Sequence, residues 1–109
     1  MPGSTIRPAA DIELNDELIR LQKRSDSAWA NLCAVQDRHG QPLQEGGWPP
    51  EGHEEWQAAW TVWGDRVDTV RAAISHWAGE SGQRRIDIET RLKGEVRGGK
   101  DPQVWPEGE

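Results

Sequence analysis

Residues 56–77 read WQAAWTVWGDRVDTVRAAISHW and carry apolar side chains at alternating steps of four and three residues. A repeat of 3.5 residues keeps one stripe of a helix facing a partner helix, as in a left-handed coiled coil. The spacing therefore predicts a helix over about residues 51–79 that packs lengthwise against another helix. The stripe consists of Trp56, Trp60, Trp63, Val67, Val70, Ile74 and Trp77.

A second stripe with the same steps predicts the partner helix, over about residues 9–39. Between the two stripes, residues 40–50 contain three Gly and three Pro, which is typical of a loop. Two stripes of equal length joined by one loop predict an all-α fold built on a long, coiled-coil-like antiparallel hairpin. The members of this stripe are Leu14, Leu18, Leu21, Ser25, Ala28, Leu32 and Val35.

Folding the chain at Glu45 or Gly46 sets the register of the hairpin. Leu18 then lies opposite Ile74, and the small Ala28 lies opposite the bulky Trp63. Close-packed interiors need this alternation of large and small side chains, so the two stripes match in volume as well as in length. Gln22 falls outside the stripe, and we expect it to be exposed.

The pattern changes after residue 77. Gly79 and Gly82 predict a break, and Ile88, Leu92 and Val96 then recur at steps of four, which predicts a short third helix over about residues 83–97. The pattern leaves open whether this helix folds back or continues the second helix. We predict one domain over residues 1–98 and a disordered tail over residues 99–109, which is rich in Gly and Pro.

The composition describes a small polar chain. Of the 109 residues 34% are hydrophobic, and the mean hydropathy is −0.88, so the chain can bury a narrow seam more easily than a thick core. A domain of this size buries little surface on folding, which favours oligomerisation. Seven Trp without Phe or Tyr, and ten Arg against three Lys, indicate a GC-rich bacterial genome.

Several locations and partners are disfavoured by the sequence. No apolar run approaches the ~18 residues of a membrane span, and residues 1–8 lack the apolar stretch of a secretory signal. Cys33 is the single cysteine, so the fold depends on no internal disulfide, and we predict a cytoplasmic location. A net charge of −6 argues against general binding to nucleic acid or to anionic membranes.

No catalytic, metal-binding or nucleotide-binding motif stands out, so we predict a non-enzymatic protein without a cofactor. The hairpin register brings His39 and His53 near each other, where with Asp37, Glu51 or Glu54 they could bind a divalent metal. Two solvated histidines near helix ends explain the same residues, and we favour that interpretation.

Our leading functional hypothesis is protein–protein contact, most simply as a homodimer with a four-helix core. It depends on apolar residues that lie off the main seam and near the loop, because such exposed patches usually mark an interface. The predicted interface residues are Trp29, Cys33, Ala59 and Val62. The biological process and any other protein partner are not predicted.

The alternative is a DNA-binding regulator that uses residues 73–97. This stretch has the outline of a helix-turn-helix, with Ala78 and Gly82 at the spacing that favours the turn. Gln83 departs from the pattern, which has an apolar residue there. The segment from residue 84 to residue 100 has six basic and three acidic residues, hence a charge of +3. The candidate DNA-binding residues are Arg84, Arg85 and Arg91.

Overall fold

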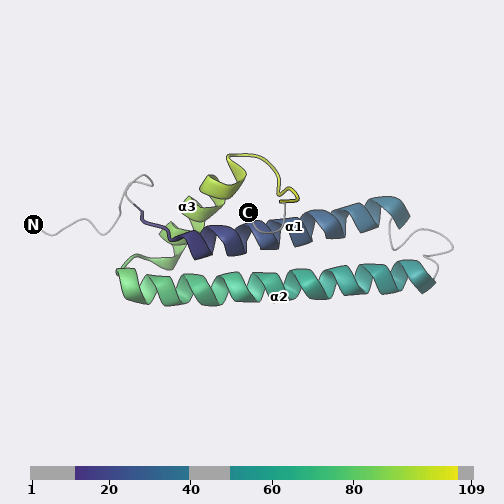
Figure 1. Ribbon diagram of the computed structural model, residues 1–109, viewed down its shortest axis with the longest axis horizontal. Helices are drawn as coiled ribbons and strands as arrows, with labels where there is room; N and C mark the ends of the chain where they lie inside the picture. Colours follow the sequence, from purple (N-terminus) through teal and green to yellow (C-terminus); the bar gives the residue numbers. More distant parts are fainter. Residues whose placement is uncertain (1–11, 40–49, 106–109) are drawn as a thin grey trace, which may run out of the picture.

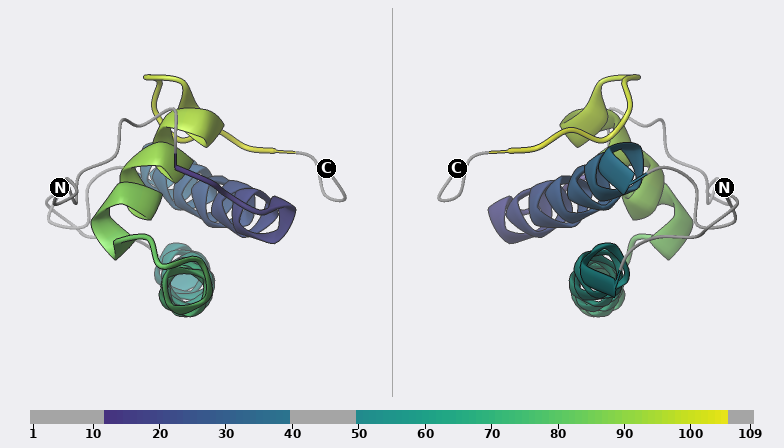
Figure 2. Two further views of the ribbon diagram at one scale, coloured as in Figure 1. Left: turned by 90° about the vertical axis from the view of Figure 1, so that its left-hand side faces the viewer. Right: turned by 90° about the vertical axis from the view of Figure 1, so that its right-hand side faces the viewer.

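Three helices make up the regular structure of the protein. The computed structural model describes residues 12–39 and 50–105. It contains α1 (Asp16–His39), α2 (Pro50–Ser81) and α3 (Arg85–Arg97). α1 and α2 run antiparallel side by side, and α3 crosses one end of the pair (Figures 1 and 2). The described residues form no strand, so the all-α class, the long hairpin and the short third helix are confirmed. The predicted loop lies outside the described residues, apart from Pro50.

α1 begins at Asp16, later than its apolar periodicity predicts, because Asn15 caps it. The Asn15 side-chain oxygen accepts a hydrogen bond from the Leu18 N–H at 2.8 Å. Asn is among the best residues at this position, because its side chain satisfies a backbone donor that has no partner within the helix. Residues 12–15 are therefore non-helical, yet Ile12 is buried in the core with 5% of its surface exposed.

The turn at Gly82 decides the direction of α3. Gly82 has a φ of 74°, and its N–H donates to the Ala78 carbonyl at 3.0 Å. This left-handed conformation, which glycine adopts without a steric penalty, ends α2. α3 then folds back across the hairpin, which answers the question that the sequence pattern left open (Figure 1).

The core is divided unequally along the hairpin. Where α3 packs, seven residues from all three helices and the preceding segment are buried together, and we call this end the three-helix half. The other end, made by residues 29–39 of α1 and 50–63 of α2, is the two-helix half, and its buried core is only Leu32, Val35 and Ala59. The larger core comprises Ile12, Leu18, Val70, Ile74, Ile88, Leu92 and Val96.

Contacts along the whole hairpin agree with the predicted register. The Trp77 indole N–H donates to the Glu13 carbonyl at 2.9 Å at one end. At the other end Arg38 pairs with Glu55 at 2.7 Å. Leu18 and Ile74, which the register places opposite each other, belong to one core cluster.

One seam position was predicted wrongly. Ala59 is 6% exposed and faces the core, whereas Trp60 is 44% exposed. A straight α-helix drifts by about 20° per heptad relative to a 3.5-residue repeat, so a stripe that faces the partner near residue 77 turns away from it toward residue 56. The neighbouring position, Ala59, takes over the inward face.

The described part of the C-terminal segment contacts α1 and is not free of the domain. The Trp105 N–H donates to the Ser27 hydroxyl at 2.7 Å, and Lys23 Nζ lies 4.5 Å from the centre of the Trp105 ring. The prediction of a disordered tail did not anticipate this contact. It gives Trp105 a hydrogen bond and a cation–π interaction with side chains of α1.

Candidate functional site

Four tryptophans gather in the two-helix half and at its border with the three-helix half. We call Trp29, Trp56, Trp60 and Trp63 the tryptophan cluster. Trp56 stacks on Trp60 with ring centres 5.3 Å apart, and Trp60 meets Trp63 edge to face, also at 5.3 Å. Trp29 joins from α1, with its ring centre 4.9 Å from that of Trp63. These stacked and edge-to-face arrangements are the favourable geometries of aromatic pairs.

The cluster follows from helix geometry and from the limited reach of α3. Residues three and four apart lie next to each other on a helix, which brings the three α2 tryptophans together. α3 packs against the core at the other end of the hairpin, and in the described part of the chain no third helix belongs to the two-helix half (Figure 1). Trp60 consequently remains 44% exposed, and the other three rings are half-buried.

The predicted interface residues do not form one surface. Trp29 and Cys33 are half-buried on α1, and Trp29 belongs to the tryptophan cluster. Ala59 is a core residue between α1 and α2 and offers no surface, which corrects its assignment to an interface. Val62 is 45% exposed, but it lies two residues after Trp60 and hence about 200° around the helix, on the opposite flank.

Sequence reasoning missed the exposed part of this surface. Trp56, Trp60 and Trp63 were assigned to the seam, where they would face α1. The available signal was the mismatch between 3.5 and 3.6 residues per turn, which turns this end of the stripe outward.

Cys33 lines a hollow on α1. The hollow has a volume of about 500 Å³ and lies between α1 and the C-terminal segment. Trp29 and Ala34 line it from the helix, and Asp101 and Pro102 line it from the segment. The C-terminal segment thus lies beside Trp29, the α1 member of the tryptophan cluster.

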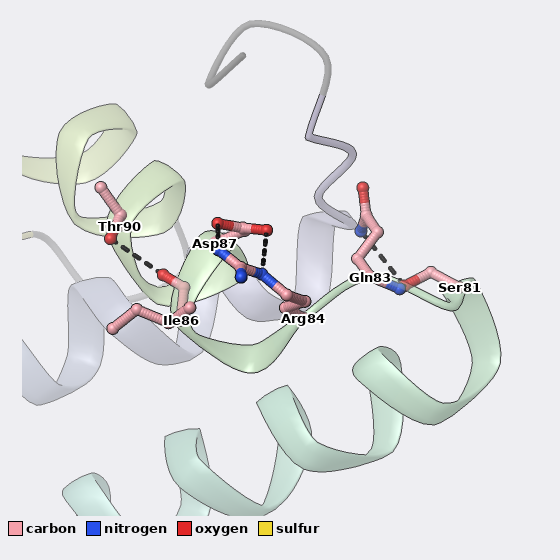
Figure 3. Close-up of polar contacts among 6 residues, drawn as sticks. All are labelled: Ser81, Gln83, Arg84, Ile86, Asp87 and Thr90. Carbon is pink, nitrogen blue, oxygen red and sulfur yellow. Dashed lines mark hydrogen bonds and ion pairs between the residues drawn. The ribbon is translucent and has the colours of Figure 1, made fainter. Parts of the chain in front are cut away.

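Each of the three candidate DNA-binding arginines pairs with a carboxylate of α3. Arg84 reaches both carboxylate oxygens of Asp87, at 3.0 and 3.1 Å, and this hydrogen bonding raises the pKa of Arg84 (Figure 3). Arg85 lies 3.7 Å from Glu89, and Arg91 lies 3.3 Å from Glu95. These carboxylates offset much of the charge that the arginines would present to phosphates.

Gln83 has a structural role at the turn between α2 and α3. It is 7% exposed, and its side-chain amide accepts from the Glu13 N–H at 2.7 Å and donates to the Glu13 carbonyl at 2.9 Å. It also donates to the Ser81 hydroxyl at 3.1 Å (Figure 3). A polar residue therefore occupies the place of the apolar residue of a helix-turn-helix, because it holds the segment before α1 against the turn.

The two histidines of the hairpin end have different surroundings. His39 Nε2 lies 3.1 Å from a Glu55 carboxylate oxygen, and its ring lies so close to Gly52 that a Cβ there would be 3.1 Å from Nδ1. His53 is exposed. Within residues 12–39 and 50–105, no group of three His, Cys, Asp or Glu side chains could hold a metal ion.

An ion pair between a buried carboxylate of α1 and a partly exposed arginine of α3 was not predicted. Asp26 is 1% exposed, and Arg97 donates to its two carboxylate oxygens at 2.8 and 2.9 Å, which raises the pKa of Arg97. Gln22 donates to the same carboxylate at 2.8 Å. Gln22 is 5% exposed, so the expectation that it is exposed was wrong. Asp26 and Arg97 are 71 residues apart, and no periodic pattern links them.

The fold and this surface define an all-α, three-helix protein with a partly exposed tryptophan cluster. Comparison of the chain with protein-family models, with curated proteins and with solved structures found no match. None of the helices in the described part of the chain has the length and apolar character needed to cross a membrane.

Proposed function

We propose that this chain is a non-enzymatic helical protein that acts through protein–protein contacts, and that its partner is a second copy of itself. The observation that carries the proposal is the tryptophan cluster on the two-helix half of the hairpin, where α3 does not complete the core. Tryptophans dominate the energetics of interface cores, and each can bury about 150–250 Å². Leaving such surface in water forgoes a large stabilisation.

The two-helix half of a second copy is a suitable partner for the tryptophan cluster, because it has the same two helices and the same apolar surface. α3 completes the core at one end of the hairpin, and a second hairpin would do the same at the other end by supplying a third and a fourth helix. A two-fold axis through this surface would place the cluster of each copy against that of its partner. The result is a homodimer with a four-helix core of coiled-coil type.

The proposed interface is centred on Trp29, Trp60 and Trp63, with Cys33 beside them. It leaves out Ala59, which is already buried within one chain, and Val62, which lies on the opposite flank. The interface therefore differs in two residues from the one that the sequence predicts.

The test compares two exposed positions on opposite flanks of α2. Trp60→Glu should convert the dimer to a folded monomer, since Trp60 is outside the intramolecular core, and Val62→Glu should leave the dimer intact. Sedimentation equilibrium measures the mass, and circular dichroism checks the helices. A wild-type chain that stays monomeric at about 100 μM refutes the homodimer. Dissociation by Val62→Glu alone would move the interface to the other flank.

DNA binding through α3 stays a prediction. A salt-dependent mobility shift with duplex DNA that Arg91→Glu abolishes would support it, because phosphate contacts release counterions.

A further inference from the structure

A hollow of about 260 Å³ opens where the three helices meet. α3 leaves α2 at the Gly82 turn and rises across α1, so α2 and α3 diverge (Figure 1). The floor of the hollow is apolar and comes from α2, with Val67, Val70 and Ile74. Two polar residues of α1, Gln22 and Ser25, form part of its wall, and both are 5% exposed overall.

Three cationic side chains line the same hollow. Arg71 comes from α2, and Lys93 and Arg97 come from α3. Arg97 is held by Asp26, whereas Arg71 and Lys93 form no hydrogen bond or ion pair with the described residues. The one acidic residue of the lining, Glu89, is paired with Arg85 at 3.7 Å. Two cations without an acidic partner among the described residues thus border an apolar hollow, in a chain whose net charge is −6.

We propose that this hollow binds a small amphipathic carboxylate. Its carboxylate lies between Arg71 and Lys93, and its apolar body lies on the α2 floor. A guanidinium matches a carboxylate in geometry and charge, and an ammonium adds a second strong donor. The volume has room for about eight or nine groups of the size of a water molecule, so the ligand is smaller than a drug-sized molecule.

The site adjoins the proposed dimer interface at Trp63, but most of its lining lies outside that interface. Its floor and the two cations Arg71 and Lys93 lie in the three-helix half, beyond the two-helix half that a second copy would cover. Trp63 is the one residue that belongs to both the hollow and the tryptophan cluster. Binding is therefore expected in a monomer and in a dimer alike.

The experiment titrates the full-length, ¹⁵N-labelled chain with octanoate at neutral pH and follows its amide resonances. Octan-1-ol and octylammonium are the matched controls, because they keep the apolar body and replace the negative charge. Octanoate should bind saturably, with shifts centred on the residues around Val70 and Lys93. The two controls should bind about fivefold or more weaker, the size of effect that a favourable surface ion pair supplies.

Charge reversal at the rim tests the assignment of the cations. Arg71→Glu and Lys93→Glu should each weaken octanoate binding by about fivefold or more. Arg20→Glu changes the net charge by the same amount at an exposed position on α1 and should leave the affinity unchanged. All three side chains are exposed, so the fold should tolerate these changes.

Three results would overturn the proposal. The first is no saturable binding of octanoate up to about 10 mM. The second is equal affinity for octanoate and octan-1-ol, which would remove the role of the cations. The third is a set of shifts centred on Trp29 and Trp60, which would place the ligand on the tryptophan cluster instead.

Discussion

Replacing Arg97 with Met should destabilise the protein more than replacing its partner Asp26 with Leu. Both changes break the same two hydrogen bonds, of 2.8 and 2.9 Å. They differ in the charge that is left behind. Arg97→Met leaves a carboxylate that is 1% exposed, whereas Asp26→Leu leaves a guanidinium whose side chain is 30% exposed and can reach water.

The solvent exposure of the group left unpaired decides how much each change lowers the free energy of unfolding. Removing one partner of a buried ion pair costs about 3–5 kcal/mol, and we expect Arg97→Met in this range. Asp26→Leu should cost about 1–3 kcal/mol, because Arg97 is resolvated while the buried Gln22 amide loses its acceptor. The double variant should cost less than the sum of the two, because an apolar pair leaves no unpaired charge.

Urea denaturation followed by circular dichroism measures the three free energies of unfolding. For a domain of this size, about 3 kcal/mol corresponds to a fall in Tm of roughly 12–24 °C, so thermal melting gives a second readout. Arg85→Met is the matched control. It breaks an exposed ion pair of 3.7 Å and should cost under about 1 kcal/mol.

Two results would refute this reasoning. Costs under about 0.5 kcal/mol for both single variants would mean that the pair does not hold α3 on α1. Strictly additive costs in the double variant would mean that the two side chains do not interact.

Three further changes test the packing. Ala28→Leu should cost about 1–3 kcal/mol in urea denaturation, because Ala28 is only 9% exposed in the seam and a larger side chain there would overpack it. An unchanged midpoint would contradict the register. Gln83→Ala should cost about 1–3 kcal/mol and speed hydrogen exchange of the Glu13 amide, which loses its acceptor; unchanged exchange would exclude that hydrogen bond. Trp105→Ala should lower the stability by about 1 kcal/mol through loss of the contacts with Lys23 and Ser27, and a value indistinguishable from zero would show that the C-terminal segment contributes nothing.

The periodic parts of the fold were predictable from the sequence. The seam residues Leu18, Val70 and Ile74 are buried as expected, and the stripe of Ile88, Leu92 and Val96 does form the buried face of a short third helix. These features depend on spacing within one helix and on matching two stripes of similar length. Both are local or nearly local properties, which a linear pattern records.

The candidate site was only half predictable. Trp29 was recognised as a large apolar residue outside the seam and was expected to stay exposed, whereas it is half-buried against Trp63. Trp60 was not recognised as a surface residue, because an ideal 3.5-residue repeat hides the drift of a real helix. For the same reason Ala59 was predicted to lie at the surface, although it faces the core.

By itself, the sequence determined the class of the fold, the pairing of α1 with α2 and the existence of α3. Only the tertiary structure decided that α3 folds back at Gly82, and this turn brings together residues that are about 70 positions apart in the sequence. The ion pair of Asp26 with Arg97 and the bonds of Gln83 to Glu13 are of this kind. A polar contact between distant residues produces no periodic pattern in the sequence. It involves a single side chain from each segment, and it forms only where the folded backbone brings the two segments together. The same turn confines α3 to one half of the hairpin. The tryptophan cluster in the other half therefore stays partly exposed.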